Sequence, residues 1–210
     1  MHMNLLLIRH GETALNVARV LQPAATPLSE RGLAQAAALG QRLKSAGLRA
    51  IVSSDLPRAL QTAQAIAAAS GLPVLTTPLL HERNFGDLRG QRYDALNYDP
   101  MTAIEAPPNG ESADQFAQRC AQAWLDVLRR QASLGGGAGG RLAVVTHGLV
   151  LRAWLQPERV DMAHCAAPAA WANTSISVVN ATPPHHVEVL NCTQHLDGLA
   201  AHDERSLSGG

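Results

Sequence analysis

Short apolar runs and amphipathic stretches alternate along most of the chain. The run "LLLI", residues 5–8, stops directly at Arg9 and His10, and an apolar run of this length bounded by Gly11 indicates an interior strand. Further parallel strands are predicted for "RAIVSS", "PVLTT" and "RLAVVTHG", at residues 49–54, 73–77 and 141–148. Charged side chains at the end of such a strand would lie at the rim of a sheet, where open α/β sheets bind ligands.

Helical patterns fill the intervals between these strands. Helices are predicted at residues 29–47, 56–71, 111–135 and 149–155. The first has an N-cap serine, Ser29, and a stop signal at Gly47, and the second ends at Gly71. The alternating segments "SISVVN" and "HVEVLN", at residues 175–180 and 186–191, predict an antiparallel pair.

This order of elements predicts the fold class. Strands that alternate with helices imply an α/β fold: a single domain with a mainly parallel central sheet, helices on both faces and one antiparallel edge strand, near residues 175–180. Residues 1–195 are expected to form this domain, and residues 196–210 a mobile C-terminal tail. The glycine-rich stretch 135–140 predicts a flexible turn, and the pattern assigns no element to residues 156–172.

Composition narrows the classes of protein. The 210 residues, 46% of them hydrophobic, are enough for one sizeable core. Basic and acidic residues number 17 each, so no overall field points to nucleic acid or to a membrane surface. Residues 5–8 are too short for a signal sequence, and three cysteines without paired spacing, Cys120, Cys165 and Cys192, suit a reducing compartment. A cytoplasmic protein is therefore expected; the oligomeric state is left open.

The ends of the predicted strands carry the candidate chemistry. The first ends on Arg9 and His10, the second is followed by Arg58 in the first turn of a helix, and the fourth ends on His147. If these strands are neighbours, two arginines and two histidines meet at one rim. The planar guanidinium group of arginine can bind two phosphate oxygens at once. Histidine can act as a nucleophile, an acid, a base or a hydrogen-bond donor to phosphate. The group that fits this set is a phosphoryl group.

The sequence resembles the histidine phosphatase superfamily, the phosphoglycerate mutase-like proteins, and within it the phosphatase branch. The resemblance rests on blocks in the family's order between residues 5 and 179: "LIRHGETALN", "PLSERGLAQA", "SSDLPRALQTA", "ERNFGDLRG", "PPNGES", "VVTHGLVLRA" and "ANTSIS". It implies a phosphomonoester hydrolase that acts through a phosphohistidine on a small phosphorylated metabolite, without metal or cofactor. Residues 1–195 would then be the catalytic domain.

The resemblance also assigns roles to individual residues. His10 matches the nucleophile, and Glu82 matches the proton donor to the leaving group. The phosphate-binding residues that it implies are Arg9, Arg58, His147 and Asn16. Gln22 and the backbone N–H of Gly148 are further candidates for contacts with the substrate.

Physical chemistry adds conditions to these roles. The ring of His10 should be neutral, with one nitrogen fixed by a backbone carbonyl such as that of Gly11. A protonated His147 would help the arginines to stabilise charge on the phosphoryl oxygens. The pKa of Glu82 should be raised by partial burial near phosphate, so that it can act as an acid.

Other polar residues in these blocks have less defined roles. Glu12 fits a second acid or a surface or capping residue and is left outside the catalytic set, and the hydroxyls of Thr13 and Ser54 are expected to bond nearby backbone. Ala24 and Ala25 stand where many relatives carry an aspartate shortly before "PLSERG". Residues 91–110 are expected to cover the site. Three residues of this segment fit either a role in lining the site or a plain packing role: Tyr93, Tyr98 and Met101.

Two alternatives to a hydrolase stay open: a phosphoglycerate mutase and a non-catalytic phospholigand-binding member. Mutase relatives tend to carry more sequence where only residues 87–109 stand here, which favours the hydrolase. A zinc site is disfavoured, because His185, His186, Cys192 and His195 form only weak metal motifs. The sequence lacks the Cys-Arg spacing of a cysteine phosphatase and the Asp-x-Asp pair of an aspartyl phosphatase.

Overall fold

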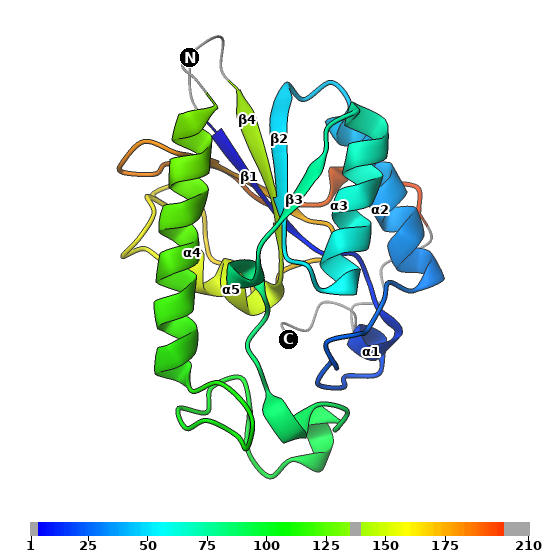
Figure 1. Ribbon diagram of the computed structural model, residues 1–210, viewed down its shortest axis with the longest axis vertical. Helices are drawn as coiled ribbons and strands as arrows, with labels where there is room; N and C mark the ends of the chain where they lie inside the picture. The colour runs from blue at the N-terminus through cyan, green and yellow to red at the C-terminus, as the bar shows by residue number, and fades with distance from the viewer. Residues whose placement is uncertain (1–3, 135–139, 200–210) are drawn as a thin grey trace.

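The computed structural model describes residues 4–134 and 140–199, and Figure 1 shows a central sheet between helices. The strands lie in the order β3-β2-β4-β1-β5-β6. Their bounds are β1 Asn4–Arg9, β2 Leu48–Ser53, β3 Val74–Thr76, β4 Arg141–Thr146, β5 Ile176–Asn180 and β6 Val187–Cys192. The pairs formed among β1 to β4 are parallel, and β5 and β6 add antiparallel pairs. The predicted fold class is confirmed.

The position of the edge differs from the prediction. The strand β5 was expected at the edge of the sheet, but it pairs with β1 on one side and with β6 on the other. The edge strands are therefore β3 and β6. The last strand β6 takes the outer place because it follows β5 in the chain and pairs with it, as consecutive antiparallel strands commonly do.

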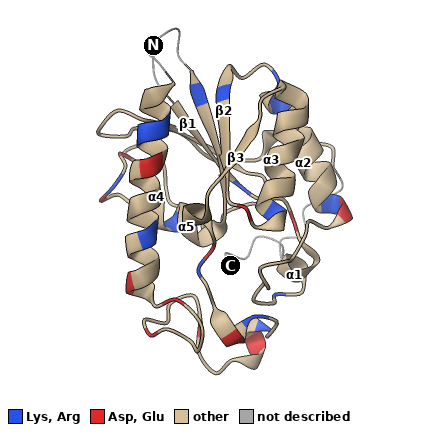
Figure 2. Cartoon of the chain, in the orientation of Figure 1, with Lys and Arg blue, Asp and Glu red and all other residues tan. Residues whose placement is uncertain are grey.

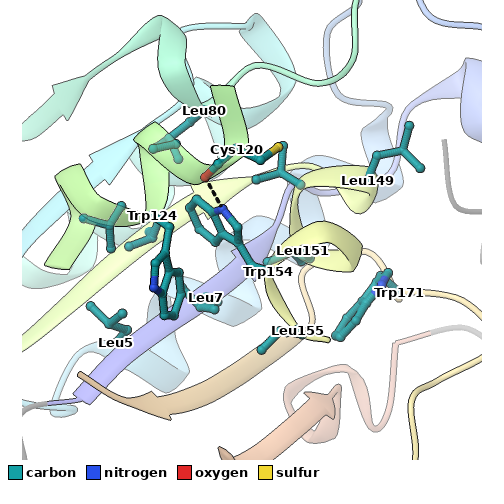
Figure 3. Close-up of a cluster of buried hydrophobic side chains, with 14 of the residues drawn as sticks. Leu5, Leu7, Leu80, Cys120, Trp124, Leu149, Leu151, Trp154, Leu155 and Trp171 are labelled. Atoms are coloured by element: carbon teal, nitrogen blue, oxygen red, sulfur yellow. Dashed lines mark hydrogen bonds between the residues drawn. The ribbon is translucent and has the colours of Figure 1, made fainter. Parts of the chain in front are cut away.

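Helices cover both faces of the sheet. They are α1 Ala14–Val17, α2 Glu30–Leu43, α3 Pro57–Ser70, α4 Ala113–Ser133 and α5 Gly148–Trp154. Alternate residues of β1 serve the two faces: Leu5 and Leu7 pack with α4 and α5, whereas Leu6 and Ile8 pack with α2 and α3. This alternation explains why an interior strand is apolar throughout. In the larger core, Trp154 Nε1 donates to the carbonyl of Cys120 over 2.8 Å (Figure 3).

Local sequence signals fix the ends of the helices. The hydroxyl of Ser29 accepts from the Gly32 amide at the start of α2, and Ser112 forms a capping box that starts α4. The helix α3 ends at Gly71, which has a left-handed φ of 75°. The helix α2 ends at Leu43, four residues before Gly47, since a turn fills the interval.

Two long segments have little regular structure. Residues 86–110, called the cover below, include only the 3-10 turns Gly86–Leu88 and Tyr93–Ala95 and lie at the lower end of the view in Figure 1. Residues 156–172 form turns in which Val160 and Trp171 are buried. The 3-10 turn Gln194–Leu196 contains the predicted boundary of the domain. Residues 200–210 of the predicted tail and 135–139 of the glycine-rich turn lie outside the described residues.

Charged residues of both signs are mixed over the surface, as Figure 2 shows along α4 and in the cover. In α4, Arg130 pairs with Asp126 at 2.6 Å, an i, i+4 contact. Within residues 4–134 and 140–199, no helix is long and apolar enough to cross a membrane.

Candidate active site

The sheet topology brings the predicted residues to one rim. The strand β4 lies between β1 and β2, so His10 after β1, His147 after β4 and Arg58 in the first turn of α3 become neighbours. The rings of His10 and His147 are 5.1 Å apart between centroids. Arg9, at the end of β1, is fully buried, and its Nη1 donates to the carbonyl of Trp171.

Backbone groups hold the ring and the main chain of His10. The ring Nδ1 lies 2.7 Å from the carbonyl of Gly11, so Nδ1 carries the proton and Nε2 has the free lone pair. The amide of His10 donates to Thr146, and Asn173 Nδ2 donates to the carbonyl of His10 over 3.1 Å. Burial, and then the positive charges of Arg58 and Arg9, lower the pKa of His10 well below 6.5. A neutral imidazole with a free Nε2 is a competent nucleophile.

Buried donors surround this histidine. Burial lowers the pKa of Arg9 and of Arg58 to about 10, which still leaves both guanidinium groups charged at neutral pH. Arg58 Nε and Nη1 and Asn16 Nδ2 are buried and have no hydrogen-bond partner among the described residues. Buried polar groups are normally paired, so unpaired donors on Arg58 and Asn16 suit a ligand with several oxygens.

His147 differs from the expectation in its protonation. Burial first, and then the charge of Arg58, lower its pKa well below 6.5, so the protein groups by themselves keep this ring neutral rather than protonated. Its Nε2 forms a 2.9 Å hydrogen bond with Ser54 Oγ, and its Nδ1 is buried without a protein partner among residues described. Ser54 Oγ also accepts from the Leu56 amide, as expected, whereas no sequence pattern predicts its contact with His147.

Glu82 is held by backbone amides from two segments. Its Oε1 accepts from the amide of Arg83 and its Oε2 from that of Leu149 in α5, both over 3.1 Å. Burial nevertheless raises the pKa of Glu82 above 4.5, against these hydrogen bonds and the nearby arginines. The expected direction of the shift is confirmed, and a neutral carboxyl group next to basic residues is suited to donate a proton.

The turn that carries Glu82 is fixed by an ion pair that sequence reasoning missed. Arg119 of α4 donates to the carbonyls of Leu79, His81 and Glu82. Its guanidinium also pairs with Glu111 at 2.8 Å. Glu111 belongs to the quoted block "PPNGES", but no local pattern connects it to a turn 29 residues earlier.

Some of the remaining candidates line a pocket together with the residues described above, and others lie elsewhere. Gln22 and Tyr93 line it together with Arg58 and Glu82, and Gln22 Oε1 accepts from the Thr13 hydroxyl over 3.0 Å. Burial raises the pKa of Tyr93 to about 12, so its hydroxyl stays protonated. Tyr98 and Met101 instead line a separate groove, which shares Tyr93 with the pocket. Gly148 is the first residue of α5, and the contact of its amide with substrate remains a prediction.

Glu12 and Thr13 support the loop that carries His10. The buried carboxylate of Glu12 accepts from the Ser29 hydroxyl at the start of α2 and lies 3.7 Å from Arg31. Glu12 is therefore an internal helix anchor rather than a surface residue. The Thr13 hydroxyl accepts from the Asn16 amide and caps α1, as expected for a residue that bonds nearby backbone.

The histidines near the C-terminal end make other contacts. His186 pairs with Asp161 at 3.1 Å, His185 contacts the carbonyl of Asn180, and Cys192 accepts from Arg42. In the part of the chain that the structure describes, no three His, Cys, Asp or Glu side chains gather in a way that could hold a metal ion.

Comparison with known proteins identifies the class of this site. The family model described as histidine phosphatase superfamily (branch 1) matches residues 5–193. The chain therefore belongs to the histidine phosphatase superfamily, as its sequence blocks predicted.

Relatives with different names match most of this chain. The curated protein named "Probable phosphoglycerate mutase GpmB" from Yersinia pestis (strain Pestoides F) is 35% identical over 184 residues, 83% of each chain. The solved structure of Bacillus stearothermophilus YhfR is 30% identical with a TM-score of 0.76, over 92% of this chain and 98% of that one. A mycobacterial glucosyl-3-phosphoglycerate phosphatase is 26% identical with a TM-score of 0.73, over 90% and 98% of the two chains.

Proposed function

We propose that the protein is a metal-independent phosphomonoester hydrolase of the cytoplasm, which acts through a phosphohistidine on a small phosphorylated metabolite. The observation that carries this proposal is the state of His10. Its Nδ1 is bonded to the Gly11 carbonyl, so its Nε2 is free, and the ring lies close enough to Arg58, whose Nε and Nη1 are buried without a partner among the described residues, for that charge to lower its pKa. A neutral nucleophile near unpaired donors suits attack on a phosphoryl group.

The residues divide the reaction into two displacements. In the first, His10 Nε2 forms a bond to phosphorus while the bond to the ester oxygen breaks, and Glu82 gives its proton to that oxygen. In the second, water attacks the phosphohistidine, its proton passes to the Glu82 carboxylate, and phosphate leaves His10. Arg9 and Arg58 stabilise the charge on the equatorial oxygens in both steps, which is the work that a metal ion does in other phosphatases.

The shape of the cover favours water over a second substrate as phosphoryl acceptor. A mutase must keep its phosphohistidine away from water, which needs a closing cover with many contacts. Here the side chain of Ile104 is 70% exposed, and Tyr98 is 47% exposed. Hydrogen bonds attach the cover to the rest of the protein at a few places: Gly90 to Leu21, Tyr93 to Arg19 and Ala103 to Arg83. Phosphoglycerate mutase activity is the second candidate, because a relative carries that name.

The test follows the phosphoryl group. Rapid quenching with a labelled phosphomonoester should trap an acid-labile, alkali-stable phosphoprotein, and His10→Ala should abolish both the label and turnover. An assay of both products then separates the candidates: inorganic phosphate should appear from several monoesters, with little exchange between 2- and 3-phosphoglycerate. Isomerisation far faster than phosphate release would replace the hydrolase by a mutase. Normal turnover in His10→Ala would remove this histidine from the mechanism.

A further inference from the structure

Arg89 is a cation in the lining of the pocket, and the reaction described above does not use it. It lines the same pocket as Arg58, Glu82 and Gln22. Backbone hydrogen bonds fix its place: the Gly90 amide donates to the Leu21 carbonyl over 2.7 Å, and the Leu21 amide donates to Gln91 over 2.9 Å. The backbone at Arg89 is thus held beside the loop that carries Gln22.

The acidic residues near Arg89 are already engaged by other groups. Both carboxylate oxygens of Asp87 accept from Asn109 Nδ2 over 3.1 Å. Glu111 is held by two bonds from Arg119 and one from the amide of Asn84. No described residue forms an ion pair or a side-chain hydrogen bond with Arg89, whose guanidinium is therefore available to a ligand.

The pocket holds more positive charge than one phosphoryl group needs. Besides burial, the charges of Arg9 and Arg89 contribute to lowering the pKa of Arg58 to about 10, which indicates that these cations act on one another. A phosphate dianion offsets two positive charges, those of Arg9 and Arg58. Arg83 also lines the pocket, but its guanidinium donates to backbone carbonyls such as that of Ala103. The charge of Arg89 remains unmatched.

We propose that Arg89 is a specificity-determining residue that binds a second anionic group, a carboxylate or a further phosphate, on the leaving group of the substrate. This inference rests on the proposed hydrolase function. An arginine fork can bind either anion through two parallel hydrogen bonds. Neutral leaving groups would leave this guanidinium without a partner, so the enzyme should favour monoesters whose leaving group is acidic.

Matched substrates test the proposal. The first pair is 3-phosphoglycerate and glycerol 3-phosphate, which differ by a carboxylate; the second is 1,3-propanediol bisphosphate and its monophosphate, which differ by a phosphate. The wild type should favour the acidic member of at least one pair by roughly 10-fold or more in kcat/KM. Arg89→Gln should lower kcat/KM for that member by roughly 10- to 100-fold, so that the kcat/KM values of the two substrates in the pair become similar. Arg89→Lys should restore part of the preference.

The control removes a charge from the same segment. Arg92 does not line the pocket and pairs with Asp94 at the surface, so Arg92→Gln should keep the preference. Equal turnover of both members of both pairs by the wild type, or an equal loss for all substrates in Arg89→Gln, would overturn the proposal. Failure to release phosphate even from p-nitrophenyl phosphate would instead refute the hydrolase. In that case, calorimetry can still measure how tightly the wild type and Arg89→Gln bind the same pairs of substrates. Equal affinities of both proteins for both members of each pair would overturn the proposed role of Arg89.

Discussion

Substitution of Gly32 by alanine should damage both stability and catalysis, although Gly32 lies outside the pocket. Gly32 is in the first turn of α2, where the backbone of the helix touches the loop that carries His10. A Cβ at this position would lie 2.0 Å from the carbonyl oxygen of Glu12 and 2.9 Å from its carbon. On the other side of the same contact, a Cβ on Gly11 would lie 2.7 Å from the Gly32 carbonyl oxygen.

The size of the effect follows from this distance. Real Cβ atoms essentially never approach closer than 3.0 Å, so the helix and the loop must separate by about 1 Å. Overpacking of this kind costs about 1–3 kcal/mol, and weakening the bond from the Ser29 amide to the Glu12 carbonyl costs about 1 more. Alanine returns about 1 kcal/mol through its better helix propensity. The expected net loss in the free energy of unfolding is about 1–3 kcal/mol. A shift of about 1 Å at His10 should lower turnover about 100-fold.

Gly40→Ala provides a matched control in the same helix. Its Cβ would lie 2.5 Å from the carbonyl oxygen of Ala65 in α3, a clash that does not involve the loop of His10. Urea unfolding should show a loss of stability in both variants. Turnover of p-nitrophenyl phosphate, corrected for the folded fraction, should fall about 100-fold in Gly32→Ala and stay within about threefold in Gly40→Ala. Normal turnover by a destabilised Gly32→Ala protein would refute the idea that α2 positions the nucleophile, and unchanged stability would refute the contact itself.

Three further outcomes are expected. The activity of the wild type should fall as the pH rises through the raised pKa of Glu82, because Glu82 then loses the proton that it donates. Glu82→Gln should remove this pH dependence and slow the hydrolysis of esters with poor leaving groups about 100-fold, which pH–rate profiles of both proteins would show. Ser54→Ala should leave His147 Nε2 without its partner and weaken inhibition by inorganic phosphate about tenfold, which a competition assay measures. Activity should survive exhaustive treatment with EDTA, and loss restored by one divalent ion would contradict the proposed use of Arg9 and Arg58.

The positions of the residues at the strand ends could be predicted from the sequence because the sheet itself determines where these residues lie. Apolar runs in the sequence identify β1, β2 and β4. Because these strands are parallel, the residues that follow them lie at the same rim of the sheet. The residues that come directly after a strand or start the next helix, His10, His147 and Arg58, can therefore be predicted from pattern alone. Roles for Asn16, Gln22 and Glu82 came only from the resemblance, since no periodicity positions a residue within a loop.

The supporting contacts could not be predicted, because they join segments far apart in the chain. The carbonyl of Trp171 meets Arg9 across 162 residues, and Asn173 meets the carbonyl of His10 across 163. Both lie at or beyond the end of a stretch, 156–172, that lacks helical or strand periodicity. Its shape is set by what it packs against, which here is the core beside α4 and α5, where Val160 and Trp171 are buried.

The charges around Glu82 show how burial and ligand chemistry are connected in this pocket. An ionised Glu82 beside Arg9 and Arg58 would neutralise part of the positive charge that a phosphoryl group needs. Burial raises the pKa of Glu82, and so favours a neutral acid that leaves both arginines to the ligand. The negative charge of a phosphate dianion acts in the same direction on the pKa of Glu82 and raises that of His147. Binding should therefore draw protons onto both groups, which supplies the acid for the first step and a cationic donor for the phosphoryl oxygens. The protonated His147 expected from the sequence is then a property of the complex rather than of the protein groups alone.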